Sequence, residues 1–194
     1  RFKDVSGPNG KPDGIIDAND ITFIWSPLPK FTYGFTNTFN YKDFDASIFL
    51  QGSYGSKIFN YTKTAIESQN SAFLNQLNTV VDRYTETNTN GSLPRFTIDN
   101  PNNNAISDRF VEDGSYMRIQ NITLGYRVPA KLLQKIKFNT VRVYFTVQNV
   151  HTFTNYSGFD PEIGAFNNDI RLMNVDAGHY PTPRTFSFGA NIEL

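Results

Sequence analysis

The sequence predicts an all-β fold, an antiparallel segment of a transmembrane β-barrel with long extracellular loops. Three observations predict it: long strands of alternating apolar and polar residues, apolar faces without Lys or Arg, and connections that alternate between short and long. A tilted strand that crosses a bilayer needs about 9–11 residues, whereas strands of globular proteins are most often about 5–6 residues long. Lipid-facing and lumen-facing side chains alternate along such a strand.

The first predicted strand, residues 31–41, has the clearest alternation. Its other face carries small and polar residues, among them Thr36 and Asn40. The two residues Lys42 and Asp43 then form a short turn into a second strand at about Phe44–Tyr54, whose polar positions include Gln51. The apolar face of the first strand consists of five aromatic residues: Phe31, Tyr33, Phe35, Phe39 and Tyr41.

Three more strands are predicted, at about residues 115–128, 141–154 and 184–194. In the third strand the apolar phase slips near Asn121, which predicts a β-bulge. The polar positions of the fourth strand include Arg142 and Gln148. The last strand reads R-T-F-S-F-G-A-N-I-E-L, and its apolar face consists of Phe186, Phe188, Ala190, Ile192 and Leu194.

Charge placement and loop lengths favour a barrel over a soluble sandwich. The apolar faces of the first, second, fourth and fifth strands contain no Lys or Arg, which would each cost about 2–4 kcal/mol at the bilayer midplane. Counting back from the last strand places every long connection at one end of the strands and every short one at the other. Outer-membrane barrels have this arrangement, with short periplasmic turns and long extracellular loops.

The connections contain weaker signals. Apolar residues at near-helical spacing predict an amphipathic helix within residues 64–84, with Asn70 or Ser71 as its N-cap. The tract 88–104 is rich in Asn, Thr, Gly and Pro and is predicted to be loop. Residues 130–137 are predicted to form one or two helical turns at the periplasmic rim.

Composition argues against several classes of function. The net charge is zero and there are no cysteines, which gives no support to nucleic-acid binding, disulfides, thiolate catalysis or Cys-type zinc sites. His151 and His179 lie on different segments, and Asp160-Pro161-Glu162 reads as a turn, so we expect no enzyme activity. The first residue is Arg and no signal peptide precedes it, and we expect the chain to be part of a longer protein.

Residues 13–20 match the second half of an EF-hand-like calcium loop, with a glycine at the turn position. The first half departs from the pattern, because Asp4 lies too far upstream and Asp20 stands where a bidentate Glu is usual. Six or more oxygens would require backbone carbonyls, Asn9 or water. Two interpretations stay open: an Asp/Gly-rich turn without metal, or a calcium site formed by Asp4, Asn9, Asp13, Asp17 and Asp20.

Five ordered motifs carry a resemblance to a known family. They are F-K-D-V-S-G-P-N-G-K-P-D-G-I-I-D-A-N-D, P-K-F-T-Y-G-F-T-N-T-F-N-Y-K-D-F-D-A-S-I-F-L-Q-G-S-Y-G, S-Y-M-R-I-Q-N-I-T-L-G-Y, R-V-Y-F-T-V-Q-N-V-H-T-F-T-N-Y-S-G-F-D-P-E and Y-P-T-P-R-T-F-S-F-G-A-N-I-E-L. In this order the chain resembles the C-terminal part of a SusC/RagA-type TonB-dependent outer-membrane transporter. The match runs from Phe2 to Leu194 and is weakest at about residues 58–108.

The resemblance implies a barrel of about 22 strands around a plug, of which this chain supplies roughly the last five strands. Residues 1–30 would be an extracellular loop and residues 31–194 barrel strands and loops, without the plug. The implied function is import of bulky nutrients, usually oligosaccharides and sometimes peptides, across the bacterial outer membrane. The implied partners are a SusD-type lid lipoprotein and the TonB complex.

Candidate contact residues follow from position. Loop aromatic residues are expected to stack on substrate or pack against the lid, although an interfacial aromatic girdle explains some of them equally well: Tyr54, Phe59, Tyr61, Tyr156, Phe159 and Tyr180. Lumen-facing polar residues are expected to line the translocation path: Thr36, Asn40, Gln51, Arg142 and Gln148. Two rival functions stay open, a TonB-dependent siderophore or cobalamin receptor and a soluble extracellular glycan-binding β-domain.

Overall fold

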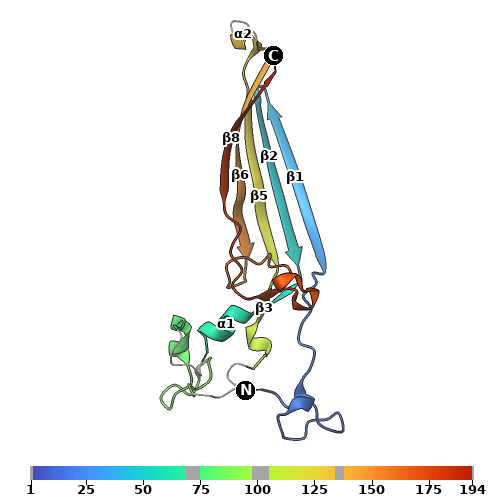
Figure 1. The fold of residues 1–194 in the computed structure, drawn as a ribbon, viewed down its shortest axis with the longest axis vertical. Helices are drawn as coiled ribbons and strands as arrows, with labels where there is room; N and C mark the ends of the chain where they lie inside the picture. Colours follow the sequence, from blue (N-terminus) through green and yellow to red (C-terminus); the bar gives the residue numbers. More distant parts are fainter. Residues whose placement is uncertain (1, 69–74, 98–104, 134–137, 194) are drawn as a thin grey trace.

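The fold is dominated by one antiparallel sheet of long strands (Figure 1). The structure is a computed structural model that describes residues 2–68, 75–97, 105–133 and 138–193. The strand order is β1-β2-β5-β6-β8. The strands are β1 (Phe31–Tyr41), β2 (Phe44–Tyr54), β5 (Tyr116–Arg127), β6 (Thr140–Thr154) and β8 (Thr185–Glu193).

The pairing register places most apolar residues of the five strands on one face, with Phe49 on the polar face opposite Thr36 as an exception. One row across the sheet reads Phe39, Ala46, Leu124, Phe145 and Phe188. The adjacent row points to the opposite face, because successive side chains alternate along a strand. That row reads Thr38, Ser47, Thr123, Thr146 and Ser187. The predicted alternation is therefore confirmed across the whole sheet.

The predicted β-bulge is also confirmed. In the pairing of β5 with β2, Asn121 and Ile119 oppose consecutive residues of β2, which leaves Gln120 as the extra residue. The pairing with β6 shifts at the same point, where one residue of β5 lies opposite two of β6. The bulge allows Ile119 and Ile122 to face the same side of the sheet although they are three positions apart.

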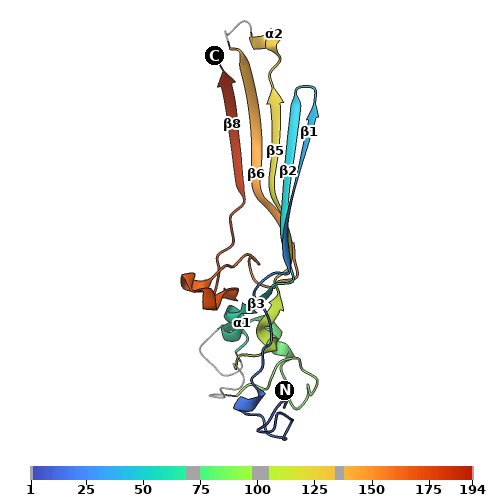
Figure 2. The ribbon, with the colours of Figure 1, turned by 90° about the vertical axis from the view of Figure 1, so that its right-hand side faces the viewer.

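Short and long connections lie at opposite ends of the sheet. The turn between β1 and β2 and the short helix α2 (Ala130–Leu133) lie at one end, near the C-terminal end of β8, whereas the long connections and residues 2–30 lie at the other (Figures 1 and 2). The helical turn predicted within residues 130–137 is confirmed over Ala130–Leu133, and the remainder lies outside the described residues.

The long connections form a small second sheet that the sequence did not reveal. It has the order β4-β3-β7, with β3 (Lys57–Asn60), β4 (Val111–Asp113) and β7 (Val175–Asp176). β3 pairs antiparallel with β4 and parallel with β7. The side chains of Ile58, on β3, and of Phe110, just before β4, are buried, at 0% and 1% exposed. These loops therefore have a hydrophobic core of their own.

The helix predicted over residues 64–84 is wrong in the parts that the structure describes. Helix α1 spans Tyr61–Ile66 and is capped by the side chain of Asn60, which accepts a hydrogen bond from the Lys63 N–H. The chain then turns back, so that the Leu77 N–H donates to the Ile66 carbonyl at 3.0 Å. The proposed caps Asn70 and Ser71 lie outside the described residues, and 88–97 is loop as predicted.

The remaining helices are single 3-10 turns: η1 (Ala18–Asp20), η2 (Asn78–Asp82), η4 (Asp108–Phe110), η5 (Phe166–Asn168) and η6 (Ile170–Leu172). Across the described ranges, no helix is both long and apolar enough to cross a membrane.

Candidate functional site

The polar face of the sheet collects all five residues predicted to face a lumen. The register pairs Thr36 with Phe49, and Gln51 with Arg118. It also pairs Gln148 with both Asn121 and Thr185. The five residues on this one face are Thr36, Asn40, Gln51, Arg142 and Gln148.

An ion pair crosses the polar face near the short-turn end of the sheet. Arg142 on β6 donates from Nε and Nη2 to the Asp45 carboxylate on β2, at 2.9 and 2.5 Å. The strand between them carries Gly125, where a Cβ would lie 2.4 Å from Asp45 Oδ1 and 2.5 Å from Arg142 Nη2. Glycine at this position therefore lets two strands that are not neighbours share a bidentate ion pair.

A second arginine on this face joins the long C-terminal loop to the sheet. Arg118 on β5 is 2% exposed. Its Nη2 donates to Asp160 Oδ1 at 2.5 Å, its Nη1 to Glu162 Oε2 at 2.9 Å, and its Nε to Thr152 Oγ1 at 2.8 Å. The Thr182 N–H donates to the other Asp160 oxygen at 3.4 Å. We call Arg118, Asp160 and Glu162 the loop latch.

The loop latch holds both legs of the connection 155–183. Asp160 lies near its start and binds Arg118 on the sheet, and Thr182 near its end donates its N–H to Asp160. Neither Arg118 nor its pairing with the loop carboxylates was singled out from the sequence. The signal in the sequence was the pair of carboxylates in Asp160-Pro161-Glu162. They lie beside the Arg118 guanidinium, because a buried cation must be neutralised by nearby anions.

The small second sheet is connected by two further polar networks. Glu112 on β4 accepts hydrogen bonds from the Ser157 N–H at 2.8 Å and from Lys63 Nζ at 3.2 Å. The Tyr156 hydroxyl donates to Asp176, whose other oxygen accepts from the Gly178 and His179 N–H groups. Burial, together with the bond to Asp176, raises the pKa of Tyr156, so its hydroxyl stays a donor.

The aromatic residues that were predicted to contact a substrate or the lid fall into a buried group and an exposed group. Phe59 and Tyr156 are both 6% exposed and pack within the loop core, so we assign them structural roles as a correction to the sequence prediction. The ring of Phe59 lies edge-on to Phe110, with centroids 6.4 Å apart. The group that remains available for a ligand or partner is Tyr54, Tyr61, Phe159 and Tyr180, of which Phe159 and Tyr180 are 79% and 85% exposed.

The Asp-rich loop is held together by hydrogen bonds from backbone amides to carboxylates. Asp20 Oδ1 accepts from the Val5 and Ser6 N–H groups at 2.7 and 3.1 Å, and its Oδ2 from the Asp17 N–H at 2.9 Å. Asp4 Oδ2 accepts from the Gly14 N–H at 2.6 Å.

These contacts bear on the calcium interpretation without deciding it. Asp4 Oδ1 is a buried oxygen without a hydrogen-bond partner. Within the described ranges, however, no three His, Asp or Glu side chains converge as a metal-binding group. The arrangement of Asp4, Asp13, Asp17 and Asp20 thus does not form a ready ligand set, and calcium binding, with Asn9 as an added ligand, stays a prediction.

The histidines and acidic pairs offer no assembled catalytic group. His151 lies beside Phe153 on the apolar face, with ring centroids 4.5 Å apart. The backbone N–H of His179 donates a hydrogen bond to the Asp176 carboxylate. Asp160 and Glu162 are engaged by Arg118.

Known proteins with similar sequences are named TonB-dependent receptors. TonB-dependent receptor P3 of Formosa agariphila is 38% identical over 197 residues, covering 100% of this chain and 19% of the relative. TonB-dependent receptor P26 of the same organism is 30% identical, covering 93% and 18%. TonB-dependent receptor SusC of Bacteroides thetaiotaomicron is 28% identical, covering 100% and 19%. No family model matches the chain.

Solved structures agree on the fold. The RagAB peptide importer in its closed-closed state superposes with a TM-score of 0.80 at 24% identity, covering 96% of this chain and 20% of that chain. Its open-open state gives a TM-score of 0.80 at 23% identity. The resemblance to the C-terminal segment of SusC/RagA-type TonB-dependent receptors is confirmed. This SusC/RagA-type segment spans about a fifth of the length of the curated relatives it matches.

Proposed function

We propose that the chain forms part of the wall of a bacterial outer-membrane importer, in which the apolar face of the sheet meets lipid and the polar face lines the lumen. The observation that carries this proposal is the sorting of side chains in adjacent rows of the sheet between the two faces. The row Phe39, Ala46, Leu124, Phe145 and Phe188 lies directly beside a row of Thr and Ser. A water-soluble β-sandwich would instead bury such an apolar row in the core between its two sheets.

The proposed cargo is a bulky nutrient, an oligosaccharide or a peptide. One relative is named SusC, and the structures of similar fold are described as a peptide importer. Exposed aromatic rings such as Phe159 and Tyr180 suit either cargo, because they stack on sugar faces and pack on apolar side chains.

The proposed partners are a SusD-type lid lipoprotein on the outside and the TonB complex on the periplasmic side. Large apolar side chains at the loop end of the sheet are unusually exposed, with Ile21 at 83% and Phe23 at 84%. An exposed apolar group of this kind marks an interaction surface, and a lid that closes over the loops would cover it.

A gene deletion combined with membrane fractionation tests the proposal. The tagged full-length transporter is expected in the outer-membrane fraction as a heat-modifiable barrel that copurifies with one lipoprotein. Its deletion is expected to abolish growth on one member of a panel of purified polysaccharides and protein digests. Unchanged growth on the whole panel, with a defect only under iron or cobalamin limitation, would favour the rival receptor.

The soluble-domain rival has its own test. Residues 1–194 expressed alone are expected to aggregate without detergent, because the apolar face is unprotected. A monomeric and folded fragment in plain buffer would contradict the membrane assignment.

A further inference from the structure

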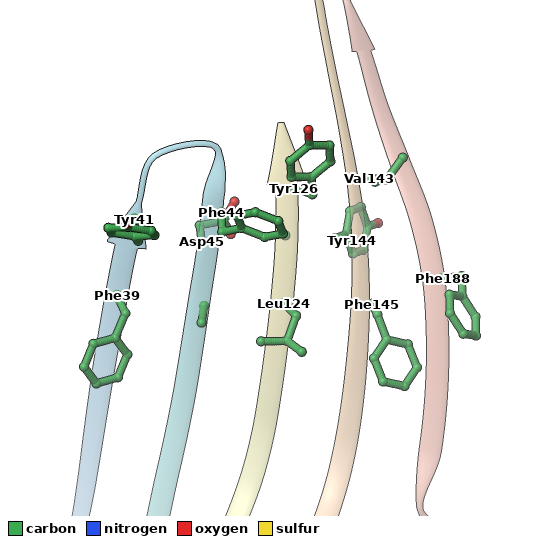
Figure 3. Close-up of a pocket in the computed structure, with 12 residues that line it drawn as sticks. Phe39, Tyr41, Phe44, Asp45, Leu124, Tyr126, Val143, Tyr144, Phe145 and Phe188 are labelled. Atoms are coloured by element: carbon green, nitrogen blue, oxygen red, sulfur yellow. The ribbon is translucent and has the colours of Figure 1, made fainter. Parts of the chain in front are cut away.

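The apolar face contains a defined depression near its short-turn end. This groove has a volume of about 420 Å³, within the range of roughly 300–1,000 Å³ typical of small-molecule sites. Figure 3 shows its lining side chains, which come from all five strands. Two aromatic pairs frame it, Phe44 with Tyr126 and Phe145 with Phe188, each with ring centroids 4.7 Å apart.

Differences in side-chain size create the groove. Ala46 lies between Phe39 and Leu124 in one row across the sheet, and Val143 follows Tyr126 in the next. The small side chains form the floor, and the rings on either side rise above them. Phe188 is 83% exposed and Phe39 56% exposed, so the walls are open to whatever surrounds the sheet.

A positively charged side chain lies next to a residue that lines the groove. Tyr41 lines the groove, and the Lys42 ammonium lies 5.3 Å from the centroid of the Tyr41 ring. Lys42 adopts a positive φ of 55° in the turn, and among the described residues every other non-glycine with a positive φ is Asn. Gly and Asn fit this conformation most easily, so a lysine here is an outlier that points to a use for its charge.

The opposite end of the sheet lacks this combination. The cavity there mixes aromatic residues such as Phe31 and Tyr54 with Asp113 and several hydroxyl groups. The nearby Lys57 ammonium is paired with Asp113 at 3.5 Å. Within the described part of the sheet, the short-turn end therefore combines an apolar groove with a lysine that suits an anionic group.

We propose that this groove is a binding site for one glycerophospholipid of the periplasmic leaflet, with an acyl chain in the groove and the headgroup phosphate on Lys42. The inference rests on the proposed membrane-spanning role, which places the short turns at the periplasmic interface. Tyr41 and Tyr126 fit this depth, since Tyr is enriched where membrane meets water. Charge complementarity selects the phosphate, because a lysine near a membrane surface attracts anionic lipid.

Native mass spectrometry of the full-length transporter tests the proposal. The delipidated protein in detergent is titrated with phosphatidylglycerol, and one tightly retained lipid is expected. Lys42→Gln is expected to weaken retention about fivefold, the effect of one lysine near a membrane surface. Ala46→Phe fills the floor of the groove and is expected to weaken it more than tenfold. Lys30→Gln, at the other end of the same hairpin, is the matched control and should retain lipid as the parent does.

The outcomes separate this inference from the proposed function. Heat-modifiable migration shows whether each variant still forms a barrel, and a parent protein that never inserts would contradict the proposed function itself. In an inserted barrel, the lipid site is overturned if no phospholipid is retained, or if Lys42→Gln and Lys30→Gln behave alike. Retention that falls with Ala46→Phe but not with Lys42→Gln would also overturn it, because the acyl chain alone would then explain binding. If Ala46→Phe fails to insert, the two lysine variants decide.

Discussion

Asp20 shows how one carboxylate can organise a loop. Backbone hydrogen bonds, first that from Asp17 and then those from Val5 and Ser6, hold the pKa of Asp20 below its usual value of 3.8. A lowered pKa means that the charged form is favoured by folding, so this contribution is present above the ordinary pKa and is lost as the pH falls through the lowered value. The protection of these three amides from hydrogen exchange, corrected for the intrinsic effect of pH, is expected to be complete from neutral pH to about pH 4 and to be lost as the pH falls further through the lowered pKa.

Asp20→Asn should have the same effect at neutral pH. The neutral amide keeps an oxygen acceptor but loses the charge that strengthens three hydrogen bonds. We expect faster proteolytic cleavage within residues 4–20 of the folded transporter, with the barrel intact. Asp108→Asn, at an exposed residue elsewhere in the loops, controls for the change of charge, and equal cleavage of both variants would contradict the assigned role of Asp20.

A calcium titration decides between the two interpretations of the Asp-rich loop. If Asp4, Asp13 and Asp17 ligate metal, calcium should raise the thermal unfolding midpoint of the intact transporter, and Asp17→Asn should abolish the rise. Magnesium is the matched control, because it demands stricter octahedral geometry. A midpoint that does not respond to calcium would leave the amide-bonded turn as the complete description.

Among the structural elements, the connection 155–183 depends most on a single contact with the sheet. Removing one partner from a buried ion pair costs about 3–5 kcal/mol, because the other charge stays buried and unpaired. Arg118→Ala is therefore expected to release this loop and increase hydrogen exchange throughout it. Arg171→Ala is the matched control in the same loop, since its pair with Asp169 is exposed to solvent and such pairs contribute little to stability. Similar exchange in both variants would show that the loop latch does not hold the loop.

The same elements show which parts of the fold can be predicted from the sequence. The long strands were predictable because each has about 9–15 residues of alternation, interrupted in β5 by one bulge, which is long enough to determine both face and bounds. β3, β4 and β7 have 4, 3 and 2 residues, which is too short for any periodicity. Arg118 could be placed on a face, but its contact with Asp160 spans 42 residues and depends on how the loop folds back. The false helix over residues 64–84 arose because apolar residues of an irregular loop fall at near-helical spacing although they do not share a buried face, with Leu77 and Val81 42% and 69% exposed.

At the scale of the whole molecule, the two faces of the sheet make opposite predictions for the same substitution. Phe145 and Thr146 are adjacent on β6, and the register directs them to opposite faces. If the apolar face meets lipid, Phe145→Lys places an ammonium in hydrocarbon and should destabilise the barrel by about 2–4 kcal/mol. Thr146→Lys places the same charge in a wet lumen and should cost much less.

Urea unfolding of the full-length transporter in phospholipid bilayers measures this difference directly. Phe145→Leu supplies the control for lost aromatic packing, since the Phe145 ring packs against Phe188 with centroids 4.7 Å apart. The comparison is informative because both lysines share one strand and nearly one depth, so that only the surroundings of the side chain differ. A larger loss from Thr146→Lys than from Phe145→Lys would require the faces to be exchanged, and with them the lumen residues and the lipid groove.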